Sequence, residues 1–219
     1  MDIKWVFAVA AVGIVGAGCR VVDNDADTPP AAETQQPASA PPVAPAPGPA
    51  TTATVPDSLN GIHFVVDISD RKLYVVRGQD TLRREPVAVG KPSHPTPTGE
   101  WKIDRVDWNP DWTPPPGEDW TEDKDPQPPG GKLNPMGRAR LVFNPPYTVH
   151  GTKERASLGD NVSHGSIRVA NEAVVQLGRM VMEAGGAAQP ENFYQEVSAN
   201  RTTMKQIPIP NPIPITVQK

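Results

Sequence analysis

Residues 147–169 have the sequence YTVHGTKERASLGDNVSHGSIRV. The stretch contains two His-Gly pairs, at positions 150–151 and 164–165, and Ser166 follows the second pair directly. A nucleophile behind a glycine can occupy a tight, exposed turn, because glycine tolerates backbone angles that other residues avoid. The amides of such a turn can face a developing oxyanion, and a nearby histidine can take the proton of the nucleophile. On its own this spacing is a weak indication of chemistry, since most such pairs are surface residues.

The same stretch resembles the signature of the L,D-transpeptidase (YkuD-like) catalytic domain. In that family His-Gly-Thr is followed, after a gap, by Ser-His-Gly-Cys, a hydrophobic residue and Arg, which matches positions 150–152 and 163–169. Residues 91–100, KPSHPTPTGE, resemble the Gly-Lys and Thr-Pro-Thr-Gly loop of the family. The resemblance extends from about position 61 to position 217 with the order of motifs kept. Two further matching pieces, NPDWTPP and NPMG, occupy residues 109–115 and 134–137.

The resemblance implies a reaction and a set of site residues. In the family, a cysteine attacks the carbonyl of the third residue of a peptidoglycan stem tetrapeptide and releases the terminal D-amino acid. An amine of a neighbouring stem, a protein or water then takes the acyl group. The catalytic positions implied are His150 as base, Ser166 as nucleophile, and His164. The oxyanion, turn and substrate-binding positions implied are Gly151, whose carbonyl would orient the imidazole, Ser163, Gly165 and Arg168.

One departure from the family pattern concerns the nucleophile, because Ser166 stands where the family has cysteine. A thiol, with a pKa of about 8.5, is readily ionised by a neighbouring imidazole, whereas a hydroxyl needs a base oriented by a third group. Asp160 is near in sequence, but a turn role suits it better. Two hypotheses follow: a cell-wall acyltransferase that works slowly through Ser166, and a degenerate module that binds stem peptides or a partner without turnover.

Composition disfavours other classes of function. The net charge is −4, so the chain lacks the basic footprint of a nucleic-acid-binding protein. Only four histidines and one cysteine are present, and no His-x-x-x-His pattern occurs. We therefore expect no metal site, no cofactor and no nucleic-acid partner.

The N-terminal sequence predicts secretion. Lys4 precedes an apolar run at 5–15, and residues 16–19 are Gly-Ala-Gly-Cys. This is a secretory signal too short for an ordinary membrane span, and it resembles a bacterial lipoprotein cleavage box with Cys19 as the lipidated residue. A plain signal peptide, cut near Ala17, is the alternative. The lipoprotein interpretation predicts a periplasmic protein anchored to a bacterial membrane by lipid.

Three segments are predicted along the chain: a signal peptide at 1–19, a disordered Pro/Ala-rich linker at 20–57, and a catalytic domain at 58–219. The linker has almost no large apolar side chains. The domain is predicted to be mainly β, a sandwich or barrel-like fold with one principal helix packed on it. That helix is predicted at 171–184, capped by Asn171 and stopped by Gly185, and residues 187–203 are left unassigned. Residues 107–135 are predicted as a long loop and 207–217 as a closing edge strand. Strands are expected at 62–68, 72–77, 82–89, 101–106, 139–143 and 147–149.

Overall fold

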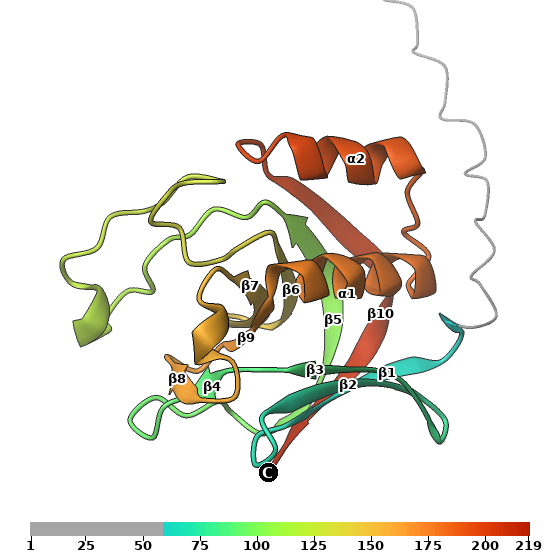
Figure 1. Cartoon of the computed structure of the whole chain (residues 1–219), viewed down its shortest axis with the longest axis horizontal. Coiled ribbons are helices and arrows are strands. Elements are labelled where there is room, and N and C mark those ends of the chain that lie inside the picture. Colours follow the sequence, from blue (N-terminus) through green and yellow to red (C-terminus); the bar gives the residue numbers. More distant parts are fainter. Residues whose placement is uncertain (1–58) are drawn as a thin grey trace, which may run out of the picture. The chain divides into compact units, whose positions relative to one another are not determined.

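The computed structural model describes residues 59–219 (Figure 1). The predicted signal peptide, the lipidation site Cys19 and the linker therefore lie outside the described residues. Within the described part, no helix is long and apolar enough to cross a membrane.

One mixed sheet dominates the fold and curls into a nearly closed barrel (Figure 1). Its strand order is β3-β2-β1-β10-β5-β6-β7-β9, and a separate short pair is formed by β4 and β8. The β1/β10 and β7/β9 pairs of the large sheet are parallel, and its other pairs are antiparallel. The prediction of a mainly β fold is confirmed. The strands are β1 (Ile62–Asp67), β2 (Lys72–Arg77), β3 (Asp80–Pro86), β4 (Val89–Gly90), β5 (Gly99–Trp108), β6 (Ala139–Asn144), β7 (Tyr147–Thr152), β8 (Asn161–Ser163), β9 (Ile167–Ala170) and β10 (Lys205–Gln218).

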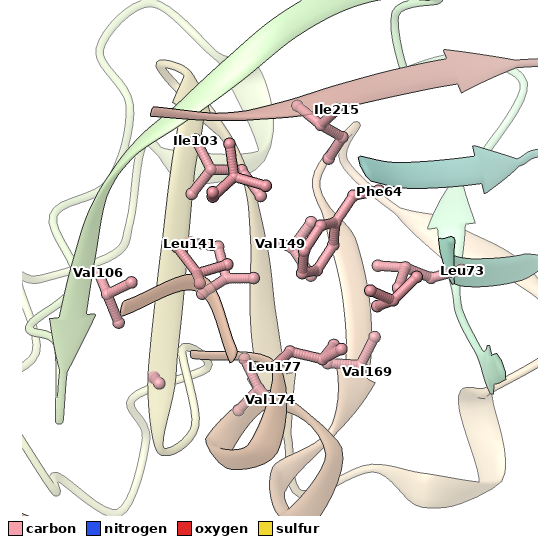
Figure 2. Close-up of a cluster of buried hydrophobic side chains, with 14 of the residues drawn as sticks. Phe64, Leu73, Ile103, Val106, Leu141, Val149, Val169, Val174, Leu177 and Ile215 are labelled. Carbon is pink, nitrogen blue, oxygen red and sulfur yellow. The ribbon is translucent and has the colours of Figure 1, made fainter. Parts of the chain in front are cut away.

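The core lies between the curled sheet and helix α1 (Asn171–Ala184) (Figure 2). Strand β1 alternates buried and half-buried residues, as a period of two requires when one face packs inward. Helix α1 buries Val174, Leu177 and Val181, at the i, i+3 and i+7 spacing of one helical face. Figure 2 shows Val174 and Leu177 beside the sheet residues of this cluster.

The ends of α1 agree only in part with the prediction. Gly185 caps its C-terminus, and Gly186 follows in the left-handed region at φ 78°, as a helix stop requires. The N-cap, however, is Ala170, without a side-chain cap. Asn171 is instead the first helical residue, and its Oδ1 accepts a hydrogen bond from the backbone N–H of Arg138 at 2.9 Å. The predicted capping role of Asn171 is therefore wrong, because its side chain is committed to the segment before β6.

A second helix, α2 (Glu191–Ala199), lies in the segment that the sequence left unassigned. Only Tyr194 and Val197 are buried along it, so its apolar pattern is too short to stand out. The Arg138 guanidinium donates to the carbonyls of Val197 and Ser198 at its C-terminal end, where a positive charge is favoured. Two short 3₁₀ turns, η2 (Asp119–Thr121) and η3 (Arg155–Ser157), complete the described elements.

Strand β10 is not the edge strand that its prolines suggested. It lies inside the sheet, between β1 and β5. The prolines at 208, 210, 212 and 214 all precede Ile215, after which β10 pairs with β1 from Phe64↔Ile215 onward. Before that point β10 pairs with β5 only, and its register with β5 shifts between Pro208 and Ile213. Proline has no backbone N–H to donate, and these four prolines lie in the part of β10 that has no hydrogen-bonded pairing with β1.

The long loop between β5 and β6 is tied down by two buried asparagines. Asn109 Nδ2 donates to the carbonyls of Val197 and Asn200, at 2.7 and 3.0 Å. Asn134 Nδ2 donates to the carbonyls of Pro110 and Pro128, each at 2.9 Å. These bonds connect the two ends of the loop to the body of the domain and to each other.

Candidate active site

A cleft of about 1090 Å³ brings most of the predicted site residues together. Its lining residues come mainly from the long loop, from strands β6 and β7 and from the turn before β9. Trp108, Trp112 and Trp120 lie in the segment predicted as a long loop, where tryptophans either pin the loop to the domain or line a substrate cleft. In the structure Trp108 ends β5 and is buried in the core, with Nε1 donating to Met182 Sδ at 3.2 Å, while Trp112 and Trp120 line the cleft. The predicted site residues that line it are His150, Ser163, His164, Ser166 and Arg168.

The parallel pairing of β7 with β9 places the predicted base close to the predicted nucleophile. In this register His150 is opposite Arg168, and Val149 is opposite Ile167. The backbone N–H of Thr148 donates to Ser166 Oγ at 3.2 Å. Within residues 59–219 no hydrogen bond joins His150 to Ser166 directly, although both side chains line the same cleft.

His150 is buried, with 3% of its surface exposed, and its tautomer follows from its neighbour. Nδ1 lies 2.9 Å from the carbonyl oxygen of Gly151, which can only accept, so Nδ1 carries the proton. The lone pair of Nε2 is then the basic site. Burial lowers the pKa of His150 to about 4, with smaller downward contributions from Arg168 and Arg140, while the bond to Gly151 opposes the shift. At neutral pH the imidazole is therefore neutral, as a general base must be.

The turn at 163–166 is held by its own serine. Ser163 Oγ donates to the carbonyl of Ser166 and accepts the N–H of Gly165 at 3.1 Å. Gly165 has φ 101°, and a Cβ there would lie 2.5 Å from Cε1 of Tyr147, so only glycine fits. Because the Gly165 amide is already bonded inside the turn, the amide of Ser166 remains as the predicted oxyanion donor.

His164 faces the long loop rather than the nucleophile position. Its ring stacks on Trp120, with centroids 3.9 Å apart and planes 17° apart. Lys91 Nζ lies 2.9 Å from His164 Nε2, and an ammonium can only donate, so Nε2 is unprotonated. Burial, followed by repulsion from Lys91 and His94, lowers the pKa of His164 to about 4. This arrangement is that of a residue that supports the turn and holds the loop.

His150 belongs to a row of ionisable side chains that crosses four neighbouring strands of the sheet. Asp107 on β5 is opposite Arg140 on β6, Arg140 is opposite His150 on β7, and His150 is opposite Arg168 on β9. Directly opposed residues project from the same face of a sheet, so these side chains are neighbours. The base is thus flanked by two guanidinium groups. Arg168 is also paired with Glu154, at 3.2 Å.

A family model, that of the L,D-transpeptidase catalytic domain (YkuD), matches residues 61–197. The chain belongs to this family. The match covers β1 through most of α2 and includes every predicted site residue except Cys19.

Similar L,D-transpeptidases are known from several bacteria. The probable L,D-transpeptidase YbiS of Escherichia coli K12 is 30% identical over 127 residues, which are 55% of this chain and 41% of the relative. The probable L,D-transpeptidase ErfK/SrfK of the same organism is 29% identical over 122 residues, 52% of this chain and 39% of the relative. The matched part thus spans about two-fifths of the length of these relatives.

Two solved structures of L,D-transpeptidases are similar to this chain at low sequence identity. An L,D-transpeptidase from Mycobacterium smegmatis has a TM-score of 0.44 at 20% identity, covering 73% of this chain and 59% of its own. One from Xylanimonas cellulosilytica has a TM-score of 0.43 at 15% identity, covering 75% and 63%.

Sequence reasoning did not find every residue of this L,D-transpeptidase cleft. The roles of Lys91, Asp107, Arg140 and the Thr148 amide were missed, because they depend on strand register and on where the loop packs, and neither can be deduced from local patterns. The one signal was that Lys91 and Thr148 lie in segments that resemble the family. Within residues 59–219 no group of three or more His, Cys, Asp or Glu residues is arranged to hold a metal ion.

Proposed function

We propose that this L,D-transpeptidase family member transfers an acyl group from peptidoglycan stem peptides, with Ser166 as the nucleophile and His150 as the base. The observation that carries the proposal is the state of His150. Its Nδ1–H is fixed by the Gly151 carbonyl, its Nε2 is unprotonated, and it lies in the same cleft as Ser166.

The proposed reaction has two covalent steps. The Ser166 oxygen bonds to the carbonyl carbon of the third stem residue as its proton passes to His150 Nε2. The C–N bond to the terminal D-amino acid then breaks, and His150 returns the proton to the leaving amine. In the second step an amine or water attacks the ester and Ser166 regains its proton. The acceptor decides between cross-linking, protein attachment and trimming.

The surroundings of Ser166 supply part of what a hydroxyl needs. The Thr148 amide donates to its oxygen and would stabilise negative charge that develops there. The orienting group of the base is a neutral carbonyl, however, which is weaker than the buried carboxylate of a serine-protease triad. Transfer slower than that of a cysteine-containing relative is therefore expected.

The alternative is a module that binds stem peptides, or a partner, without turnover. The hydrogen-bond pattern at Ser166 favours it, since the hydroxyl oxygen accepts from the Thr148 N–H and is not bonded to His150. Both candidates use the same cleft, and they differ only in whether Ser166 reacts.

The replacements Ser166→Cys and Ser166→Ala separate the two candidates. If the surrounding site is competent, Ser166→Cys gains stem-peptide turnover and rapid acylation by a carbapenem such as imipenem, with which the L,D-transpeptidase LdtMt1 forms a complex. Under the enzyme proposal, the natural protein shows slow transfer that Ser166→Ala abolishes, with an acyl adduct on Ser166 by mass spectrometry. Equal binding without turnover in both proteins supports the binding module. A folded Ser166→Cys variant that stays inert rejects the site assignment.

We also propose where the protein acts. Peptidoglycan chemistry requires a location outside the cytoplasm, and the sequence that ends at Cys19 resembles a bacterial lipoprotein cleavage box. The proposed form is a periplasmic protein anchored through Cys19 to a bacterial membrane.

A further inference from the structure

One wall of the cleft carries two arginines presented by a single buried carboxylate. Asp107 is fully buried, and its oxygens accept from Arg105 Nε at 2.8 Å and from Arg140 Nε at 2.8 Å. Arg140 Nη2 lies 2.7 Å from the same oxygen of Asp107. Both arginines line the cleft, and they share this one buried carboxylate. The half-exposed carboxylate of Asp111 also lines the cleft and forms a longer ion pair with Arg140, with Oδ1 3.7 Å from Nη2, which is beyond hydrogen-bond distance.

One edge of the Arg140 guanidinium is left without a hydrogen-bond partner in the described part of the chain. Its Nε and Nη2 are committed to Asp107, and no hydrogen bond in the described part of the chain engages Nη1. Nη1 is also not among the buried unpaired atoms, of which residues 59–219 contain only Arg138 Nε. Nη1 is therefore accessible to solvent, in agreement with the 18% exposure of the side chain, and Arg140 is one of the residues that line the cleft. A guanidinium fixed on one edge and open on the other is prepared to bind a carboxylate.

The strand order places this open edge where a leaving group would lie. Ser166 precedes β9, His150 is on β7 and Arg140 is on β6, so nucleophile, base and guanidinium follow one another across adjacent strands. In the proposed reaction His150 protonates the amine of the terminal D-amino acid. The α-carboxylate of that residue is attached to the same Cα as the amine, and opposed side chains start only about 4.5–5.5 Å apart.

We propose that Arg140, held by Asp107, binds the terminal carboxylate of the donor tetrapeptide and so selects peptides that end one residue beyond the attacked carbonyl. The inference rests on the proposed function, because it places the leaving residue of that reaction. Arg168 is the competing cation next to His150, and Arg105 and Lys124 also line the cleft. Arg168 lies on β9, on the nucleophile side of His150, and Glu154 already pairs with it. In the proposed complex the leaving residue lies on the other side of His150, beside Arg140.

The test compares binding of two peptides, the stem tetrapeptide with a free C-terminal carboxylate and its C-terminal carboxamide. Binding is measured by calorimetry in the Ser166→Ala background, so that no turnover intervenes. The free acid is expected to bind about 10- to 100-fold more tightly than the amide, the range for a hydrogen bond to a charged group. Adding Arg140→Gln should remove this preference, and Arg140→Lys should retain part of it. Arg84→Gln, at an exposed arginine that covers Tyr74, is the matched control and should keep the full preference.

Each other outcome is decisive. Thermal melts show whether the Arg140 variants are folded. If Arg140→Gln is not folded, Arg140→Lys still allows the test, because its positive charge can pair with the buried Asp107 carboxylate. If Arg168→Gln removes the preference and Arg140→Gln keeps it, the carboxylate binds on the opposite side and the proposal is overturned. If the background protein binds acid and amide equally well, Arg140 has no such role, while the stem-peptide function stands. If neither peptide binds, the proposed function itself fails.

Discussion

At the scale of single residues, His150 combines features that suit a base and disfavour a charge. It is buried, two arginines flank it across the sheet, and its Nδ1–H is committed to a carbonyl. Burial and the two positive charges penalise the imidazolium, which lowers the pKa to about 4. The same environment that keeps His150 neutral, as the proposed base must be, makes protonation of this side chain costly to the fold.

Acid should therefore destabilise the domain through His150. Its pKa falls from 6.5 in the unfolded chain to about 4 in the folded one, so between these values the unfolded state binds more protons. The free energy of unfolding should fall as pH drops from about 6.5 to 4, by on the order of 3 kcal/mol from this residue. His164, whose pKa is also lowered, acts in the same direction. Urea unfolding at a series of pH values measures the slope.

The control for this experiment compares the replacement of a histidine in the cleft with that of a histidine outside it. His150→Gln should reduce the dependence of the free energy of unfolding on pH between pH 6.5 and 4. His63→Gln removes a histidine that bonds Thr216 on the β1/β10 pair and should leave the profile steep. A profile unchanged by His150→Gln would contradict the buried, neutral state of this histidine.

The site residues that could be predicted from the sequence are those that belong to one short motif along the chain. The spacing of His150 and of 163–168 could be matched to a family pattern, and the structure places most of these side chains around one cleft. Asp107 and Arg140 could not be found in this way, because they become neighbours of His150 only through strand register. The Gly165 amide was expected to face an oxyanion, but nothing in the pattern showed that Ser163 would bond it first.

At the scale of elements, the long loop between β5 and β6 is the part that shapes the cleft. Trp112 and Trp120 extend from it into the cleft wall, and Trp120 stacks on His164 of the catalytic turn. His94 Nε2 lies 3.5 Å from Glu118 of the same loop, and Trp120 Nε1 donates to that carboxylate at 3.2 Å. The proline-rich composition predicted a loop, and the buried asparagines make it an ordered one.

Removing one of these asparagines should loosen the loop and leave the barrel intact. Asn134→Ala deletes the donor to Pro110 and Pro128 and the acceptor for the Met136 N–H, each of them a buried or half-buried bond. Unsatisfied buried groups cost about 1–3 kcal/mol each, which local opening of the loop would relieve. Hydrogen exchange should rise in residues 110–136 and stay unchanged in α1. Asn161→Ala, at an exposed position, should change neither, and equal exchange in both variants would contradict the anchoring role of Asn134.

Two elements show where local patterns mislead. The prolines of β10 suggested an edge strand, yet the strand lies inside the sheet, because its prolines precede the part that has two partners. Helix α2 buries only Tyr194 and Val197, so it owes its position to tertiary contacts such as Arg138 at its end. Helix α1, with a full apolar face and a Gly-Gly stop, was predicted with the bounds that the structure has.

At the scale of the whole molecule, the single thiol is separate from the proposed nucleophile. The chain has one cysteine, Cys19, which lies outside the described residues, and the rest of the sequence contains none. The proposed nucleophile, Ser166, carries a hydroxyl. A thiol reagent therefore cannot block the cleft of the natural protein, although it should block the cleft of Ser166→Cys.

Lipidation of Cys19 is the prediction that concerns the chain as a whole. An apolar run ends at Gly-Ala-Gly-Cys, and lipoprotein processing would cut before the cysteine and acylate it. Expressed in a bacterium that makes lipoproteins, the mature protein should begin at Cys19, carry acyl chains by intact mass, and fractionate with membranes. A single acyl chain anchors only marginally, so several chains are expected for stable attachment. Cys19→Ala should release the protein to the soluble fraction without changing the melting temperature of the domain. An unmodified N-terminus downstream of position 19 would show instead that the segment is a plain secretory signal.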